Sequence, residues 1–296
     1  MAVLSIQSHV VYGYAGNTAA VFPLQRLGHE VWAVNTVEFS NHTGYGSWRG
    51  KVLGADLAKE LITGLEERNA LINCGAVLSG YLGDASTGSI ISDTVKKVRK
   101  FSPYALYTCD PVMGDTGRGF YVKNEIVQII KDELVPLADI VCPNQFELQA
   151  LTGININNID DALKAVNILH EIGPSVVLVT SFKEKQKKEK NPELSMIASV
   201  RKDTAQIYKI TTPELPLGGD IAGTGDMTTA VFLSRYLETK DIEKTLELCT
   251  ASVYGILETS YRTALRPDSN PVELKIIENQ EQLVSPVHSF KAEKIL

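Results

Sequence analysis

Residues 3–35 read VLSIQSHVVYGYAGNTAAVFPLQRLGHEVWAVN, and their pattern decides the fold class. Residues 3–7 form a short apolar run, residues 17–27 repeat apolar side chains at helical spacing, and residues 30–35 form a second apolar run. Short apolar runs bounded by turn residues are typical of buried strands, and a longer amphipathic stretch is typical of a helix. Since two parallel strands need such a crossover between them, this stretch predicts a strand–helix–strand unit.

The same alternation continues along most of the chain. Further apolar strands are expected at residues 76–79, 106–110, 140–142 and 176–180. Further helices are expected at residues 56–68, 87–100, 124–137, 146–152, 160–171, 228–236 and 241–258. Because Val, Ile and Leu fill the strands almost without interruption, both faces of the sheet must be covered. The sequence therefore predicts an α/β protein with three layers, α/β/α, around a central and mostly parallel sheet.

Two segments depart from this pattern. Residues 36–50 combine Asn, Gly, Ser and aromatic residues and are too polar for a core strand. Residues 196–200 and 205–210 flank a short polar turn, as the strands of a hairpin would. Because no linker divides the chain, we expect one domain over residues 1–296, with a small β element at 36–50 that serves as a lid.

The composition restricts the class of protein. A net charge of −6 and a hydrophobic content of 44% favour a globular protein with small ligands over a nucleic-acid-binding surface. The four cysteines are widely spaced, which favours buried thiols in a reducing cytoplasm over disulfides or a zinc site. The N-terminus lacks the features of a signal peptide, and no apolar run approaches the ~18 residues of a membrane span. We therefore expect a cytoplasmic protein that binds neither nucleic acid nor a membrane.

A basic run occupies residues 183–190, with five lysines and two glutamates. Mixed charge at this density is typical of a solvated loop. The alternative is a flap over a nucleotide, because the run lies close to Thr180 in the sequence.

Gly223-Thr224-Gly225-Asp226 stands directly before one of the expected helices. Glycines let a backbone approach a phosphate closely, and the free amides at a helix N-terminus point at its charge. An aspartate there can accept the proton of an attacking hydroxyl group. The alternative is a strand-to-helix turn in which Thr224 or Asp226 caps the helix. Because the Gly-x-Gly-x-x-Gly and P-loop patterns are both absent, this tetrapeptide is the main candidate for a phosphate site.

Carboxylates follow neighbouring strands of the predicted sheet. Asp110 and Asp115 come at the end of one strand, and Glu147 comes after the next one. Open α/β sheets bind ligands at the carboxyl ends of their strands, and Mg²⁺ takes one or two carboxylates together with waters and substrate phosphates. These residues are therefore candidate magnesium ligands. Alternatively, Asp115 is a turn residue and Glu147 is a charge that stabilises a helix N-terminus.

Longer blocks of the sequence resemble known kinases. Asn144-x-x-Glu147 followed by Gly223-x-Gly-Asp226 resembles the ribokinase family of small-molecule kinases. Asp110-Pro-Val-Met-Gly resembles the branch of that family that phosphorylates hydroxymethyl groups on vitamin rings. The blocks at residues 5–17, 35–45 and 79–83 closely resemble pyridoxal kinases, and the resemblance spans residues 3–260.

The resemblance implies a ribokinase-like fold and an ATP-dependent kinase that phosphorylates the 5′-hydroxymethyl group of pyridoxal, and of pyridoxine or pyridoxamine, in vitamin B6 salvage. Asp226 would be its catalytic base. The backbone of Gly223, Thr224 and Gly225 would bind the negative charge of the transferred group. The implied substrate-binding residues are Ser8, Phe39, Thr43, Tyr81 and Asp226, among which Phe39 and Tyr81 would provide the aromatic walls that suit a flat ring.

Further roles are implied on the ATP side. The implied ATP-binding residues are Asp110, Glu147, Thr180, Pro213, Gly223 and Gly225, with residues 213–222 beside the adenine. The implied metal ligands are Asp110, Asp115 and Glu147 for Mg²⁺. A monovalent cation, usually potassium, is also implied, although Cys142 stands where some relatives have a hydroxyl residue. Residues 115–121 are a second candidate lid. Residues 36–50 would form a homodimer contact, and His42 would shape that segment rather than act as a base.

Three alternatives stay open at this point. The first is a hydroxymethylpyrimidine kinase, which shares the Asp110–Gly114 type of segment, although the aromatic blocks speak against it. The second is a sugar kinase of the same fold, although the expected ring contacts are aromatic rather than carboxylate or amide. The third is a carrier of pyridoxal phosphate without catalytic activity, against which the intact Asp226 and its glycines argue.

Overall fold

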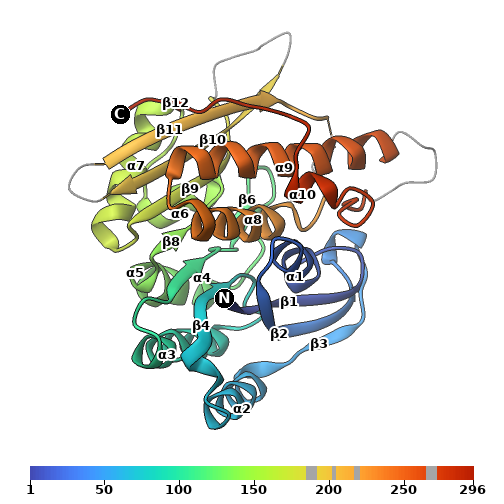
Figure 1. Ribbon diagram of the computed structural model, residues 1–296, viewed down its shortest axis with the longest axis vertical. Coiled ribbons are helices and arrows are strands. Elements are labelled where there is room, and N and C mark those ends of the chain that lie inside the picture. Colours follow the sequence, from blue (N-terminus) through green and yellow to red (C-terminus); the bar gives the residue numbers. More distant parts are fainter. Residues whose placement is uncertain (185–191, 202–204, 217–220, 265–271) are drawn as a thin grey trace.

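The computed structural model describes residues 1–184, 192–201, 205–216, 221–264 and 272–296, and these residues build a three-layer α/β/α fold (Figure 1). Its central sheet has ten strands in the order β12-β11-β10-β9-β8-β5-β4-β1-β2-β3. The strands are β1 (Ala2–Tyr12), β2 (Glu30–Asn41), β3 (Gly50–Val52), β4 (Cys74–Ser79), β5 (Leu106–Cys109), β8 (Ile140–Val141), β9 (Val176–Phe182), β10 (Glu193–Arg201), β11 (Ala205–Pro213) and β12 (Glu293–Lys294). The six strands from β9 to β2 in this order pair in parallel, which confirms the predicted sheet.

Helices cover the two faces of the sheet and bury one hydrophobic cluster each. One face carries α1 (Asn17–Arg26), α8 (Thr224–Thr239), α9 (Ile242–Ala264) and α10 (Glu281–Val284). The other face carries α2 (Gly54–Glu67), α3 (Ala85–Phe101), α4 (Asn124–Ile129), the π-helical turn η3 (Ile130–Leu134), α5 (Val135–Leu137), α6 (Gln145–Thr152) and α7 (Ile159–Ile172). Successive residues of one strand serve opposite faces, since Val3 packs in the first cluster and Leu4 in the second.

The first two strands are longer than predicted. The expectation that strand β2 ends at residue 35 is wrong, because β2 continues to Asn41 and pairs with the extended end of β1, with Val10 opposite Phe39. Beyond Val37 the residues of this extension are only partly buried, and their polar side chains therefore do not oppose strand formation. Strand β3 pairs antiparallel with β2 and closes a unit that we call the β2–β3 hairpin (residues 36–52), which includes the turn η1 (Thr43–Tyr45).

The antiparallel end of the sheet confirms the hairpin predicted from residues 196–200 and 205–210. Strands β10 and β11 pair antiparallel, and β10 also pairs antiparallel with β9. Residues 202–204 lie outside the described residues. Strand β12 comes from the C-terminal tail and adds to β11, so the tail packs on the sheet edge.

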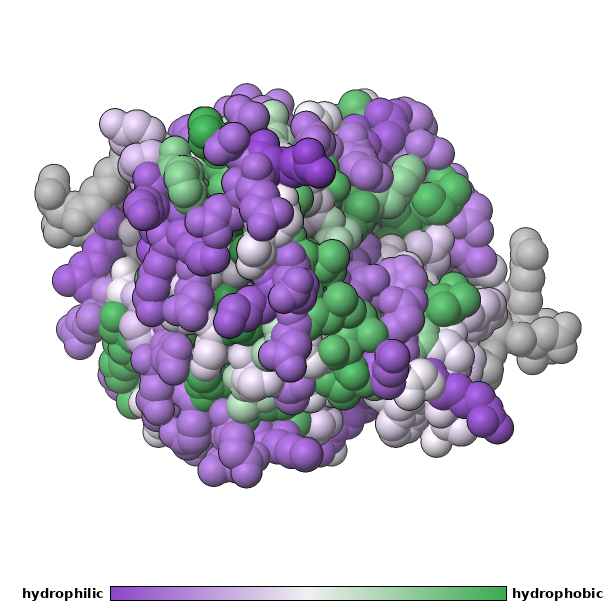
Figure 2. Space-filling model, turned by 90° about the horizontal axis from the view of Figure 1, so that it is seen from below, coloured by the Kyte–Doolittle hydropathy of each residue, from purple (hydrophilic) through white to green (hydrophobic). Residues whose placement is uncertain are grey.

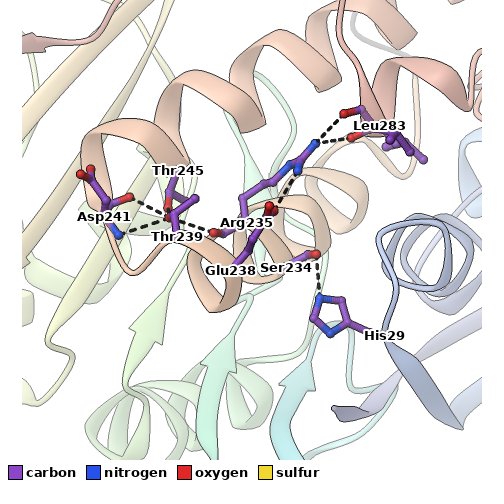
Figure 3. Close-up of polar contacts among 9 residues, drawn as sticks. His29, Ser234, Arg235, Glu238, Thr239, Asp241, Thr245 and Leu283 are labelled. Atoms are coloured by element: carbon purple, nitrogen blue, oxygen red, sulfur yellow. Dashed lines mark hydrogen bonds and ion pairs between the residues drawn. The ribbon is translucent and has the colours of Figure 1, made fainter.

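Residues 272–285, which we call the C-terminal strap, cross the face formed by α1, α8 and α9. Leu274, Ile276 and Leu283 are fully buried there. The guanidinium of Arg235 in α8 donates to the carbonyl oxygens of Leu283 and Val284, as Figure 3 shows. Nearby, His29 and Ser234 join α8 to the turn after α1 with a contact of 2.8 Å between Nε2 and Oγ (Figure 3). The contacts of Arg235 thus hold the strap against α8.

No helix within the described ranges is long and apolar enough to cross a membrane.

Candidate active site

A cavity of about 720 Å³ opens at the carboxyl ends of the parallel strands and gathers nearly all the predicted site residues. This is the edge at which open α/β sheets bind ligands. Its lining includes Ser8, Phe39, Thr43, Tyr81, Asp110, Asp115, Glu147, Thr180, Gly223, Thr224, Gly225 and Asp226. Pro213 is not among the described residues that line the cavity, although its neighbour Thr212 is.

Helix α8 begins at the floor of this cavity without a side-chain cap. Its N-cap is Gly223, with a φ of 80° and no side-chain hydrogen bond. A Cβ atom at Gly223 would lie 2.4 Å from the carbonyl oxygen of Tyr14, so only glycine fits between the two backbones. The alternative in which Thr224 or Asp226 caps the helix is therefore wrong. The amides of the first turn face the cavity without a capping side chain, which is the arrangement that binds phosphate at helix N-termini.

Asp226 lies in that first turn and is held by a second helix start. Its Oδ2 accepts a hydrogen bond of 2.8 Å from the amide of Gly16, the residue before α1. Gly16 has a φ of 56°, and a Cβ atom there would lie 2.2 Å from the carbonyl oxygen of Ser8. Burial raises the pKa of the Asp226 carboxyl, and the Gly16 amide opposes that rise. Asp226 is thus a fixed carboxylate with an enhanced tendency to accept a proton.

Two further carboxylates are buried beside it. Asp110 Oδ2 accepts a hydrogen bond of 3.2 Å from the hydroxyl of Thr229. Burial raises the pKa of Asp110 well above its ordinary value, and the negative charges of Glu147 and Asp226 raise it further. Burial also raises the pKa of Glu147, although backbone amides oppose the rise. The cluster therefore repels added negative charge and favours a cation.

Glu147 also has a structural role. Asn144 and Glu147 form a capping box at the start of α6, in which each side chain accepts a hydrogen bond from the other residue's amide, at 2.9 and 3.0 Å. The second carboxylate oxygen of Glu147 accepts a hydrogen bond of 3.0 Å from the amide of Met113. The Asn-x-x-Glu pattern thus fixes the turn after β5 and also brings a carboxylate to the cavity.

The carboxylate set fits Mg²⁺ bound mainly through a substrate. No group of three or more His, Cys, Asp or Glu side chains in the described part of the chain is arranged to hold a metal ion. Mg²⁺ needs fewer protein ligands than that, because waters and phosphates complete its shell. Asp115 is exposed on the small hairpin β6 (Gly114–Asp115) and β7 (Gly119–Phe120), and its Oδ1 accepts a hydrogen bond from the Thr116 amide.

The wall formed by the β2–β3 hairpin carries the aromatic residues. Phe39 lies on β2, with its ring centroid 6.2 Å from that of Trp48, and both side chains line the cavity. Tyr81 follows β4, and its carbonyl oxygen accepts a hydrogen bond of 2.7 Å from the Thr36 hydroxyl. Ser8 lies where the β1–β2 register shifts, which turns this residue toward the cavity. These side chains make a slot that suits a flat ring with polar substituents.

Comparisons with known proteins agree with this geometry. A profile of the phosphomethylpyrimidine kinase family matches residues 56–273. A pyridoxal kinase PdxY from Rubrobacter xylanophilus is 46% identical over 293 residues, which cover 99% of this chain and 97% of that protein. The chain belongs to the pyridoxal kinase family. The sequence resemblance described above is thereby confirmed.

Other members of the pyridoxal kinase family show the same relationship. The enzyme from Arabidopsis thaliana is 39% identical over 99% of this chain and 94% of its own length. The structure of the pyridoxal kinase from Leishmania donovani in complex with ADP and pyridoxamine has a TM-score of 0.92 at 28% identity, covering 100% of this chain and 99% of that one. These relatives confirm the ribokinase-like fold class.

The sequence patterns did not predict the wall of the cavity that β10, β11 and α9 form. Met196 and Ile210 are paired in register across β10 and β11, as are Leu194 and Thr212, and all four line the cavity. Helix α9 faces them with Val253, Tyr254 and Leu257. Within the sequence these residues follow ordinary strand and helix periodicity, so nothing distinguishes them from core residues. The predicted segment at 213–222 is described only in part, because residues 217–220 lie outside the described ranges.

The lining of the cavity has two further features. Ser181 has a φ of 54° at an irregularity in the β9–β10 pairing, and both Thr180 and Ser181 line the cavity. Arg118, on the turn between β6 and β7, is the only Lys or Arg side chain among the described residues that line the cavity. The basic run at 183–190 lies almost entirely outside the described residues.

The close approach at Gly16 predicts that alanine destabilises the fold more at this position than at Gly28. Gly28→Ala should lower the free energy of unfolding by about 1 to 2 kcal/mol, because Gly28 also has a positive φ but has open space around it. Gly16→Ala should cost about 1 to 3 kcal/mol more, because its Cβ would meet the Ser8 carbonyl. Urea unfolding followed by circular dichroism measures both. Equal losses in the two variants would contradict the close approach at Gly16.

Proposed function

We propose that this chain transfers the γ-phosphoryl group of ATP to the 5′-hydroxymethyl group of pyridoxal and so forms pyridoxal 5′-phosphate. The observation that carries the proposal is that an uncapped helix start with its own aspartate, Asp226, shares one cavity with the aromatic slot of the β2–β3 hairpin. The pyridoxal kinase from Leishmania donovani was crystallised with ADP and pyridoxamine, and with ADP and pyridoxine. These complexes support ATP and a pyridoxal-type ring as the two substrates.

Asp226 accepts the proton of the hydroxymethyl group in this mechanism. An ordinary aspartate has a pKa of ~3.9, far below that of a primary alcohol, so the proton moves late, after the bond to the leaving group has weakened. The raised pKa of Asp226 makes it a stronger acceptor than an exposed aspartate. The hydrogen bond from Gly16 meanwhile holds one carboxylate oxygen, which leaves the other for the substrate hydroxyl.

The helix start stabilises the charge that the transferred group carries. Amides of Thr224, Gly225 and Asp226 lie in the first turn of α8, where aligned backbone dipoles favour an anion. Asp110 and Glu147, together with Asp115, would hold Mg²⁺ directly or through water. When bound, Mg²⁺ neutralises charge on the ATP phosphates. Thr180 and Arg118, which both line the cavity, would contact those phosphates.

Each substrate has its own part of the cavity. Phe39 and Tyr81 would pack on the faces of the pyridine ring, while Ser8 and Thr43 would bind its polar substituents. The apolar wall of β10, β11 and α9 would receive the adenine, with the segment that begins at Pro213 beside it. A monovalent cation such as potassium would lie near the buried carboxylates, where the repulsion among them favours positive charge.

The second candidate substrate is a hydroxymethylpyrimidine, which is related to the phosphomethylpyrimidine after which the matching family is named. That ring is also flat and carries a primary alcohol, so the aromatic slot alone does not exclude it. The full-length relatives named as pyridoxal kinases favour pyridoxal.

One assay tests the proposal and the second candidate together. Purified protein with Mg-ATP should phosphorylate pyridoxal, and turnover with hydroxymethylpyrimidine should be much lower, as measured by chromatography of the phosphorylated products. Replacing potassium by a bulky organic cation should reduce the rate. The absence of any phosphorylated vitamer, with pyridoxal bound all the same, would contradict the proposal and favour a carrier.

Removal of the proposed base should affect turnover more than binding. Asp226→Ala should lower kcat about 10²- to 10⁴-fold, because the hydroxyl loses its proton acceptor. Pyridoxal affinity, measured by calorimetry, should change little, because the ring contacts remain. The matched control is Asp241→Asn, at the exposed junction between α8 and α9, which should leave kcat unchanged. Similar turnover in Asp226→Ala and the wild type would show that another group accepts the proton.

We further propose that the chain forms a homodimer in the cytoplasm, acting as one kinase domain over residues 1–296. Exposed apolar side chains concentrate in its first quarter: Val11, Tyr12, Trp48, Val52, Leu57 and Leu61. Figure 2 shows apolar surface among hydrophilic side chains on the lower face of the molecule, the side where α2 lies in Figure 1. The four free cysteines are all buried, which suits a reducing compartment.

Light scattering tests the dimer. The wild type should have twice the mass of one chain, and Leu61→Glu should shift it toward the monomer because a charge enters the apolar contact. Tyr104→Glu is the control, since Tyr104 is 95% exposed on the loop before β5, away from the β2–β3 hairpin. A monomeric wild type would contradict the proposal.

A further inference from the structure

We propose that Glu273 is a positioning residue that holds the substrate wall of the β2–β3 hairpin against the loop that supplies the Gly16 amide. The inference rests on the proposed function for its effect on pyridoxal. It concerns a residue of the C-terminal strap, 228 residues away in sequence from its partner Tyr45.

One carboxylate joins three donors from two different elements. Glu273 Oε1 accepts a hydrogen bond of 2.8 Å from the Tyr45 hydroxyl and lies 3.1 Å from Nε2 of His42. Its Oε2 accepts a hydrogen bond of 3.0 Å from the amide of Tyr14. Tyr45 and His42 belong to the β2–β3 hairpin, and Tyr14 belongs to the loop between β1 and α1. Glu273 is thus the polar link between these two elements.

The site around Glu273 is built for a charged carboxylate. Burial by itself would raise the pKa of Glu273, but the hydrogen bonds from His42 and Tyr45 lower it below its usual value. A Cβ atom at Gly13, whose φ is 85°, would lie 2.4 Å from Glu273 Oε1. The carboxylate therefore lies directly against bare backbone. The rings of His42 and Tyr45 pack together, with centroids 4.7 Å apart, so the two donors move as a unit.

Both elements that Glu273 joins also reach the reacting groups. His42, Thr43 and Gly44 line the cavity where the substrate would bind. On the other side, the loop that contains Tyr14 packs its carbonyl oxygen against Gly223 and donates the Gly16 amide to Asp226. A displacement of the hairpin would widen the substrate wall, whereas Asp226 would keep its hydrogen bond to Gly16.

Glu273 itself is held in place by the strap. Its neighbours Leu274 and Ile276 are fully buried, and the amide of Lys275 donates a hydrogen bond of 2.9 Å to the Ser260 hydroxyl of α9. Farther along, Arg235 binds the carbonyl oxygens that end α10 (Figure 3). The strap is therefore the fixed part and the exposed β2–β3 hairpin the part that it orders.

Glu273→Ala should change the KM for pyridoxal without changing the KM for ATP. Since a hydrogen bond to a charged group contributes substantially to binding and order, we expect the KM for pyridoxal to rise about tenfold to a hundredfold. The KM for ATP should stay unchanged, because the nucleotide wall lies on β10, β11 and α9. Glu278→Ala is the matched control, as Glu278 is exposed on the same segment and its side chain pairs with Lys275. Equal rises in both KM values, or no rise in either, would overturn the inference.

A second variant isolates the contact. Tyr45→Phe removes one hydroxyl, and if Glu273 acts through Tyr45, the double variant with Glu273→Ala should show less than the product of the two single effects on the KM for pyridoxal. If the KM for pyridoxal in the double variant rises by the product of the two single effects, the inference is overturned.

Hydrogen exchange gives a readout that does not need turnover. Backbone amides at residues 42–46 should exchange faster in Glu273→Ala than in the wild type, and at the wild-type rate in Glu278→Ala. Unchanged exchange in Glu273→Ala would overturn the inference even if the wild type phosphorylates pyridoxal. Faster exchange in a protein that does not act on pyridoxal would support the positioning role while contradicting the proposed function.

Discussion

The active site depends on two places where backbones meet without room for a side chain. Gly223 lies against the carbonyl oxygen of Tyr14, and Gly16 lies against the carbonyl oxygen of Ser8. These approaches bring the starts of α1 and α8 together, so that the Gly16 amide reaches Asp226. The substrate slot and the phosphate site belong to opposite ends of the sequence and share this junction. Its geometry decides whether a hydroxyl in the slot lies near the helix start.

The electrostatics of the cavity follow from the sheet. Asp110 and Glu147 reach the same sheet edge because each follows a parallel strand, and the fold buries them before any cation is bound. Asp110 is thereby disfavoured as an anion by burial and by its neighbours. In the proposed function, a magnesium–nucleotide complex would relieve that cost and so couple nucleotide binding to the charge state of the cluster. The only Lys or Arg on the described lining, Arg118, lies on the exposed β6–β7 turn rather than within the cluster.

The features that could be predicted from the sequence are those that depend on neighbouring residues in the chain. The parallel strands, the covering helices and the chemical groups at strand ends follow from hydrophobic period and turn residues. Gly223, Gly225 and Asp226 could be recognised as candidates because glycines before a helix suit a phosphate and an aspartate there can accept a proton. By contrast, the extension of β2 to Asn41 depends on pairing with β1, and the wall of Met196, Ile210 and Tyr254 depends on how a hairpin faces a helix. Glu273 gave no signal, since its partners are remote in sequence and it resembles any surface glutamate.

The long separation between Tyr45 and Glu273 has a consequence for biosynthesis. The β2–β3 hairpin is synthesised early, and its anchor Glu273 follows 228 residues after Tyr45. Domains fold as their residues are synthesised, N-terminal parts first. During that interval the hairpin has neither the strap nor α8 to order it, so the cavity on the nascent chain is incomplete. The hairpin can therefore be anchored to Glu273 only after the strap has been synthesised.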